Sequence, residues 1–200
     1  LRHFRARAAR FQTLHPIAFH LPFRGPWICT QADHGPTHQG PWRHAFDFEV
    51  VGEEGSKHAR EGAAVEDFHC FRLPVLAAAP GTVVKVVADV ADNAIGEMNV
   101  AQNWGNLVLV HHAPGLYSLY AHLARGSAKV REGQLVAAGE VLGLCGSSGR
   151  SPVPHLHFQL QATHRIGAPT LPCTFSDVVR ADRLEPTCAP RLGEIVRRVE

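Results

Sequence analysis

From residue 72 onward, short hydrophobic runs alternate with turn-forming residues. The segment 82–87 (TVVKVV) is rich in β-branched residues and follows the turn pair Pro80-Gly81, which is typical of a strand that leaves a turn. Similar runs occupy 75–79, 106–112, 116–122, 134–136 and 140–143, and a last one lies around Phe158 and Leu160. Strands at intervals of about 8–12 residues predict a mainly β fold, an antiparallel sandwich or a partly open barrel.

The N-terminal part of the chain has a different pattern. Residues 1–14 place apolar side chains at helical spacing, which predicts a short helix. Residues 16–41 are rich in Pro, Gly and His, which favours extended segments and loops. A strand is expected at 45–51 and a surface loop at 52–70. The apolar positions of the predicted helix are Phe4, Ala8, Phe11 and Leu14.

The C-terminal part, 166–200, contains several prolines. We expect it to wrap the core as loops and to end in a short helix at 192–199. The sequence therefore divides into an N-terminal extension at 1–29, a β domain at 30–165 and a C-terminal wrap at 166–200. We expect peripheral loops around the β domain and a short helix at each end of the chain.

Composition and charge exclude some classes of protein. Hydrophobic residues make up 45% and charged residues 19% of the chain, which is ordinary for a globular protein. A formal net charge of +2 gives no argument for nucleic-acid binding. No run approaches the roughly 18 apolar residues of a transmembrane helix. The chain starts without Met or a signal-peptide apolar region, so we expect a mature or trimmed form.

The cysteines do not form a metal or redox motif. They lie far apart and include no C-x-x-C pair, which argues against a zinc ribbon or a thioredoxin-like site. Their odd number leaves at least one thiol free in a monomer, and the sequence does not assign any disulfide pairing. They are Cys29, Cys70, Cys145, Cys173 and Cys188.

The most informative chemical motif is Pro154-His155-Leu156-His157-Phe158. Side chains alternate along a strand, so the two histidines point to the same face. One imidazole can then bind a metal while the other lies beside the metal-activated water. The alternative is a pair of hydrogen-bonded structural histidines.

Two further residues fit such a site. Asp47 is a carboxylate between two aromatic residues on a predicted strand, and it pairs either with a metal or with Arg43 in a salt bridge. His122 ends a predicted strand, where it either meets the His155–His157 strand or is bonded to water or backbone. His38 or His44 upstream of Asp47 would complete the roughly three protein ligands of a catalytic zinc site.

A resemblance to a known family becomes specific at several motifs. The segments APGTVV (79–84), GNLV (105–108), YSLYAHL (117–123), VREGQLV (130–136) with Gly139, and GSSGRS (146–151) precede the PHLHF motif in one uninterrupted order. Together they resemble the lysostaphin/LytM-type zinc metallopeptidases, which have a duplicated hybrid motif fold, over roughly residues 30–165.

The resemblance implies a set of site residues. The family holds its metal with a His, an Asp and the second His of H-x-H, and the last two match Asp47 and His157. The two other active-site histidines match His122 and His155, and the sequence does not distinguish which of them is the general base.

The first metal ligand departs from the common family pattern. Arg43 stands where members usually have a His, four residues before the Asp. His44 has the wrong strand parity, whereas His38 resembles a variant pattern with the ligand on the preceding loop. We therefore expect His38, with His44 second and His34 a distant third. Val153 also replaces a common Gly before the PHLHF motif.

The resemblance implies a zinc-dependent endopeptidase that hydrolyses amide bonds of peptidoglycan peptides outside the cytoplasm, in the periplasm or cell envelope. One alternative is a non-catalytic relative that binds and activates other wall hydrolases. Another is a carbohydrate- or peptide-binding β module. The residues do not specify which bond is cut, the oligomeric state or the role of the N-terminal extension.

Overall fold

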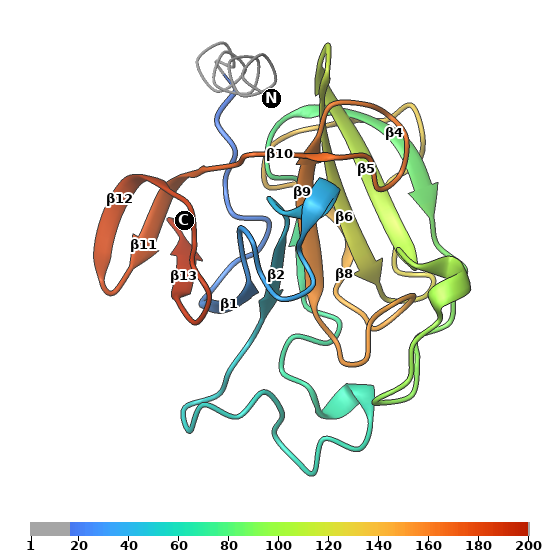
Figure 1. Ribbon diagram of the computed structural model, residues 1–200, viewed down its shortest axis with the longest axis vertical. Helices are drawn as coiled ribbons and strands as arrows, with labels where there is room; N and C mark the ends of the chain where they lie inside the picture. The colour runs from blue at the N-terminus through green and yellow to red at the C-terminus, as the bar shows by residue number, and fades with distance from the viewer. Residues whose placement is uncertain (1–16, 200) are drawn as a thin grey trace.

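The computed structural model of the protein describes residues 17–199, which fold into two antiparallel sheets (Figure 1). The predicted mainly β, antiparallel class is confirmed. In spatial order, the large sheet consists of β12 (Arg183–Cys188), β11 (Phe175–Arg180), β13 (Ile195–Arg198), β1 (Trp27–Gln31), β2 (Phe46–Glu49), β9 (Leu156–Gln161), β6 (Leu116–Leu123), β5 (Asn106–Ala113), β4 (Gly81–Val87) and β7 (Leu135–Val136), with β10 (Thr170–Leu171) paired to β9. The small sheet pairs β3 (Pro74–Leu76) with β8 (Val141–Leu144).

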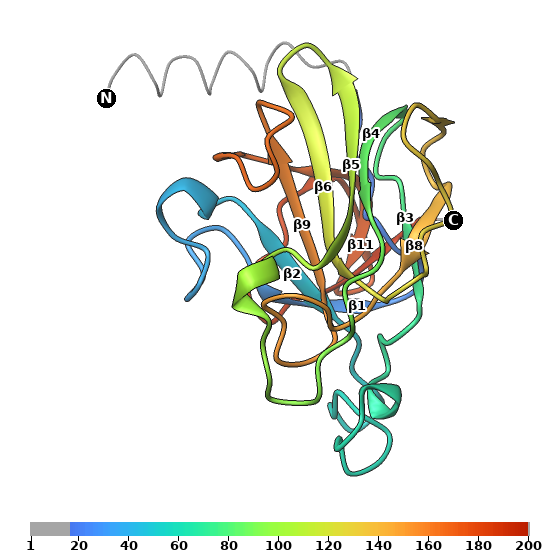
Figure 2. The same ribbon diagram turned by 90° about the vertical axis from the view of Figure 1, so that its right-hand side faces the viewer.

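The main core lies between these two sheets. Inward side chains of β2, β5 and β9 share one buried cluster with Val75 of β3 and Leu142 of β8. Figure 2 shows β3 and β8 beside β4 and β5 of the large sheet. The alternation of hydrophobic and polar residues in the sequence therefore has its expected origin, because one face of each strand packs into this core.

The predicted C-terminal helix at 192–199 is wrong. Ile195–Arg198 is strand β13, which pairs with β1 on one side and β11 on the other. Val196 is fully buried while Ile195 is half exposed, and this alternation suits a strand in a sheet. Backbone pairing with distant strands overrides the weak local helical preference. The predicted helix at 1–14 lies outside the described residues.

Helical structure is sparse elsewhere. Between residues 17 and 199 it consists of three short 3-10 turns, η1 (Gly40–Trp42), η2 (Val65–Asp67) and η3 (Val100–Gln102). Over these residues, no helix is long and apolar enough to cross a membrane. All five cysteines are buried with free thiols.

Candidate metal centre

Asp47 and His157 lie directly opposite each other on the neighbouring strands β2 and β9. Their neighbours along each strand point into the core, so alternation turns Asp47 and His157 to the other face of the sheet. The distance from His157 Nδ1 to Asp47 Oδ1 is 2.9 Å. The core-facing neighbours are Phe46, Phe48, Leu156 and Phe158.

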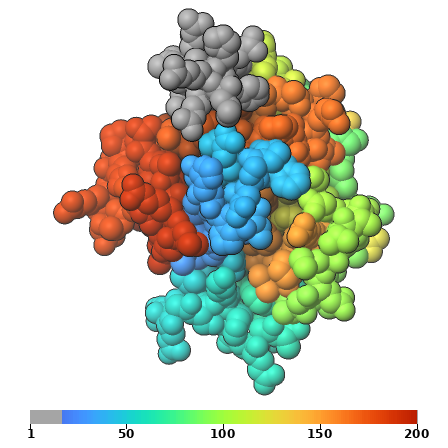
Figure 3. Space-filling model, in the orientation of Figure 1, coloured from blue at the N-terminus to red at the C-terminus, as the bar shows by residue number. Residues whose placement is uncertain are grey.

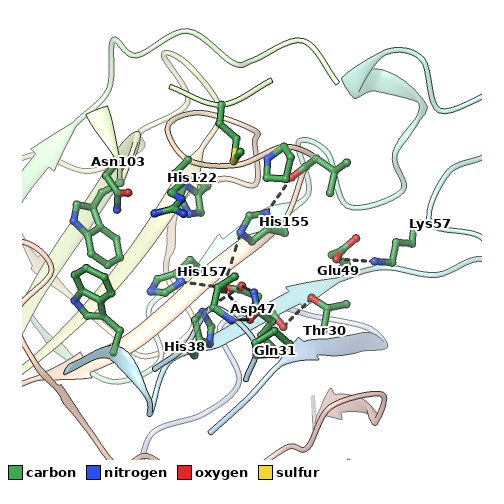
Figure 4. Close-up of a pocket in the computed structure, with 18 residues that line it drawn as sticks. Thr30, Gln31, His38, Asp47, Glu49, Lys57, Asn103, His122, His155 and His157 are labelled. Atoms are coloured by element: carbon green, nitrogen blue, oxygen red, sulfur yellow. Dashed lines mark hydrogen bonds and ion pairs between the residues drawn. The ribbon is translucent and has the colours of Figure 1, made fainter. Parts of the chain in front are cut away.

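His38 reaches the same point from the loop between β1 and β2. Its Nδ1–H donates to the carbonyl of Ala45 at 2.9 Å, and its Nε2 lies 3.3 Å from Asp47 Oδ2. The possible ligand atoms of His38, Asp47 and His157 all lie within 4.8 Å of one another, and all three residues are buried. Figure 4 shows the three side chains converging.

The hydrogen bonds around these rings leave their lone pairs facing Asp47. Gln159 Nε2 donates to Gln161, so Gln159 Oε1 accepts from His157 Nε2–H at 3.0 Å. His157 Nδ1 then carries a lone pair, as does His38 Nε2, whose ring donates through Nδ1. With these tautomers His38, Asp47 and His157 form three acceptors at one buried point, and a cation bound between them would satisfy all three. Two imidazoles and one carboxylate suit zinc, and three protein ligands are typical of a catalytic site.

The charge of Asp47 fits this arrangement. Burial raises the pKa of Asp47, but His155, His157 and His38 together lower it by a larger amount. The pKa of Asp47 therefore lies well below its usual range. Gln31 Nε2 also donates to Asp47 Oδ2 at 2.8 Å, which favours the ionised form. Asp47 is therefore a carboxylate at neutral pH.

The other histidine considered as a first ligand, His44, lies away from this cluster. Its Nδ1 is 2.6 Å from Asp33 Oδ1, and the guanidinium of Arg43 donates to its Nε2 at 3.0 Å. Burial lowers the pKa of His44. Arg43 therefore contacts His44 and does not form the salt bridge with Asp47 that the sequence left open. The ion pairs of Asp47 are with histidines. His34 lies beside His44, with ring centroids 6.3 Å apart.

A β-bulge places His122 beside the metal cluster. Val108 pairs with Tyr120 but Asn106 pairs with Leu123, so Ala121 and His122 together oppose a single residue of β5. The φ of His122 is +62°, a left-handed conformation that a non-glycine residue adopts only at a cost of about 1–3 kcal/mol. Without the bulge, alternation would turn His122 toward the core.

His122 and His155 face each other with ring centroids 4.7 Å apart. His122 Nδ1–H donates to the carbonyl of Ser148 at 2.8 Å, and His155 Nδ1–H donates to the carbonyl of Val153 at 3.0 Å. Each ring therefore keeps an Nε2 acceptor, and that of His155 lies 3.9 Å from Asp47 Oδ1. Burial, followed by His155 and His157, holds the pKa of His122 well below its usual range.

These residues line one cleft of about 650 Å³. Figure 3 shows the surrounding surface, where the blue segment near residue 40 borders the green segment near residue 100. Asn103 lies at one side of the labelled cluster and the Glu49–Lys57 pair at the other (Figure 4). Trp42 and Trp104 line the cleft in an edge-to-face pair 5.9 Å apart.

Sequence reasoning missed several residues that line the cleft or contact the His38–Asp47–His157 cluster. Gln159 could have been found, because strand alternation puts it on the same face as His157. Trp42, Trp104, Gln31 and Lys57 lie on loops or strand ends, where no periodicity indicated which way their side chains point.

An antiparallel β fold with a His-Asp-His cluster and two further histidines beside it defines a candidate metallopeptidase. The chain belongs to peptidase family M23, whose family model matches residues 67–169. The resemblance to the lysostaphin/LytM-type metallopeptidases, a family of peptidoglycan hydrolases, is thereby confirmed.

Individual relatives match only parts of this chain. It is 42% identical over 94 residues to the DD-carboxypeptidase/endopeptidase Mpg of Neisseria meningitidis serogroup B, covering 46% of this chain and 20% of that protein. It is 38% identical over 90 residues to the murein hydrolase activator EnvC of Escherichia coli, covering 44% and 20% respectively. The chain thus spans about a fifth of these relatives. The antimicrobial peptidase lysostaphin from Staphylococcus simulans aligns at 21% identity and TM-score 0.46, over 72% of this chain and 46% of that chain.

Proposed function

We propose that this protein is a zinc-dependent endopeptidase that hydrolyses amide bonds in peptidoglycan peptides. The observation that carries the proposal is the convergence of three lone-pair acceptors, His38 Nε2, Asp47 Oδ2 and His157 Nδ1, on one buried point. These three residues would hold the zinc. Because family M23 hydrolyses the cell wall and related proteins carry peptidase names, the proposed location is extracytoplasmic.

Zinc bound there would supply Lewis-acid polarisation of the substrate carbonyl and a water activated near neutral pH. His122 and His155 handle the protons, because each presents a free Nε2 toward the cleft and fixes its Nδ1–H on a backbone carbonyl. A neutral ring accepts a proton from water, and a protonated ring donates to the departing amine. With centroids 4.7 Å apart, the two rings lie side by side at the same wall of the cleft.

The test combines metal content with digestion of purified peptidoglycan. The purified chain should contain about one zinc per molecule and release soluble peptide fragments, and a chelator should abolish cleavage until zinc is restored. A variant with both His122→Ala and His155→Ala should keep the zinc but lose cleavage. Cleavage that persists after complete zinc removal would contradict the proposal.

A second function is favoured by the similarity to the murein hydrolase activator EnvC. In that case the chain would bind another wall hydrolase and stimulate it. The presence of His122, His155 and the three acceptors favours hydrolysis by this chain itself. If the zinc-loaded chain cleaves nothing but accelerates a purified wall amidase, the activator function replaces the proposed one.

A further inference from the structure

The cleft extends past the metal cluster to an ion pair between buried Glu49 and partly exposed Lys57. Glu49 follows Asp47 by two residues on β2, so both side chains lie on the same face of the sheet. Two residues of strand span about 7 Å. Glu49 thus lines the cleft about one substrate residue away from the proposed metal.

Glu49 is unusual for a carboxylate at the wall of a cleft. Its side chain is only 6% exposed, and within residues 17–199 its Oε2 has no hydrogen-bond partner. Such a buried charge requires a cation beside it. Lys57 provides one, with Nζ 2.9 Å from Glu49 Oε1.

Lys57 is held in place yet accessible. The carbonyl of Lys57 accepts from the backbone N–H of His69 at 3.1 Å, which fixes the loop from residue 52 to 70 at this point. Its side chain is 44% exposed and lines the cleft. An ammonium group has three donors, of which Glu49 uses one, and across the described residues Lys57 forms no other ion pair.

We propose that Lys57 is a specificity-determining residue that binds a carboxylate of the substrate residue next to the scissile amide. The proposal rests on the proposed function, because that function supplies the peptide. Peptidoglycan peptides carry free carboxylates along their backbones, and some of these are converted to carboxamides. Glu49 acts as a positioning residue that keeps Lys57 directed along the cleft.

Binding of two matched probes tests the proposal. The probes are cross-linked stem-peptide dimers whose diaminopimelate carboxylates are either free or amidated. Titration calorimetry measures their Kd for the zinc-loaded chain carrying His122→Ala, after a digestion assay has established that this variant does not cleave the probes. His122 lies on the side of the cleft away from Lys57 (Figure 4). The free carboxylates should bind roughly tenfold or more tightly, as expected for a charge-assisted hydrogen bond.

The preference should disappear with Lys57→Gln and persist with Lys57→Arg. The double change Glu49→Gln with Lys57→Gln should also abolish it without leaving a buried unpaired charge. The control Lys85→Gln breaks a Lys85–Glu132 pair of 3.0 Å outside the cleft and should change neither Kd. Equal binding of both probes, or a preference that survives Lys57→Gln, overturns the proposal. Cleavage by the chain with its native His122 is assayed separately, so failure of the proposed function gives a different result.

Discussion

The residues of the candidate metal site come from two sides of the cleft, which differ in how they hold them. His122, His155 and His157 lie on or beside β6 and β9, inside the family-matched span 67–169. His38 and Asp47 lie outside that span, on the β1–β2 loop and on β2. We call the part with β6 and β9 the strand side and the part with the β1–β2 loop and β2 the loop side. The family match rests on the strand side, while a complete set of ligands requires both sides.

This difference shows what each side contributes to chemistry. The segment 67–169 provides three of the four histidines around the cluster, and among them His157 lies within hydrogen-bond distance of Asp47 while its other ring nitrogen is bonded to Gln159. The other side provides the carboxylate of Asp47, which has ring nitrogens of His38, His155 and His157 within 3.9 Å. Asp47 is thus the point at which the two sides meet.

The largest expected effect follows from removing this shared residue. Asp47→Ala should abolish stoichiometric zinc and lower cleavage by far more than a hundredfold, because even residues that only orient metal ligands are worth about 10–100-fold. Zinc content by mass spectrometry and a peptidoglycan digestion assay measure the two losses.

A matched control is available for this change. Asp33 also pairs with a histidine, His44, at 2.6 Å, but outside the metal cluster. Asp33→Ala should leave zinc and cleavage unchanged. If both aspartate variants retain zinc, the metal is not held at Asp47.

The second prediction separates the two histidines of the loop. His38→Ala should lose stoichiometric zinc, because its Nε2 is one of the three converging acceptors. His44→Ala should keep zinc, because Asp33 and Arg43 occupy its ring nitrogens. The measurement is zinc bound per chain after dialysis, and loss of zinc from His44→Ala alone would place the first ligand at His44.

The sequence predicted the site residues of the strand side, His122, His155 and His157. Two of them followed from the simple two-residue period of a strand. Alternation along the strand was enough to put His155 and His157 on one face, and the position of Asp47 between two aromatic residues marked it as a charge that needs a partner. The mainly β class followed from the same signal. Pairing partners such as those of β13 are set by distant segments, so the helix expected there could not be excluded from local pattern.

The loop side was less accessible to such reasoning. His38 was preferred over His44 from strand parity and a resemblance, but its hydrogen bond to Ala45 depends on a loop path that no periodicity encodes. His122 shows the same limit on the strand side. Its orientation depends on a bulge and a positive φ, neither of which the hydrophobic pattern indicates.

The third prediction compares residues that orient the ligands from each side. Gln159→Leu removes the acceptor of His157 Nε2–H, and Gln31→Leu removes a donor to Asp47. Each should weaken zinc affinity or cleavage by about 10–100-fold. Competition with a chelator measures the affinity. Gln134→Leu, which removes a bond to Glu140 away from the cleft, should have no effect, and an equal loss in it would indicate a general effect on folding.

The smallest effect concerns a strand-side histidine outside the metal cluster. His112 donates through Nδ1–H to the carbonyl of Pro80 at 2.7 Å, and its Nε2 lies 2.7 Å from Ser118 Oγ. Burial lowers the pKa of His112 to about 4. The folded protein therefore keeps His112 neutral at pH values where the unfolded chain already takes up a proton.

The sign of the resulting pH dependence follows from linkage. The contribution of His112 to the free energy of unfolding is complete above about pH 6.5 and is lost as the pH falls toward 4, because the unfolded state binds the extra proton. Between these values the slope from this one group is at most about 1.4 kcal/mol per pH unit. His112→Gln should reduce the slope by up to that amount, measured by urea unfolding of the zinc-free chain at several pH values. His111→Gln serves as the control on the same strand. An unchanged slope in His112→Gln would mean that packing between β5 and β6 does not keep this histidine neutral. Burial would then lower a histidine pKa at His122 in the cleft but not at His112.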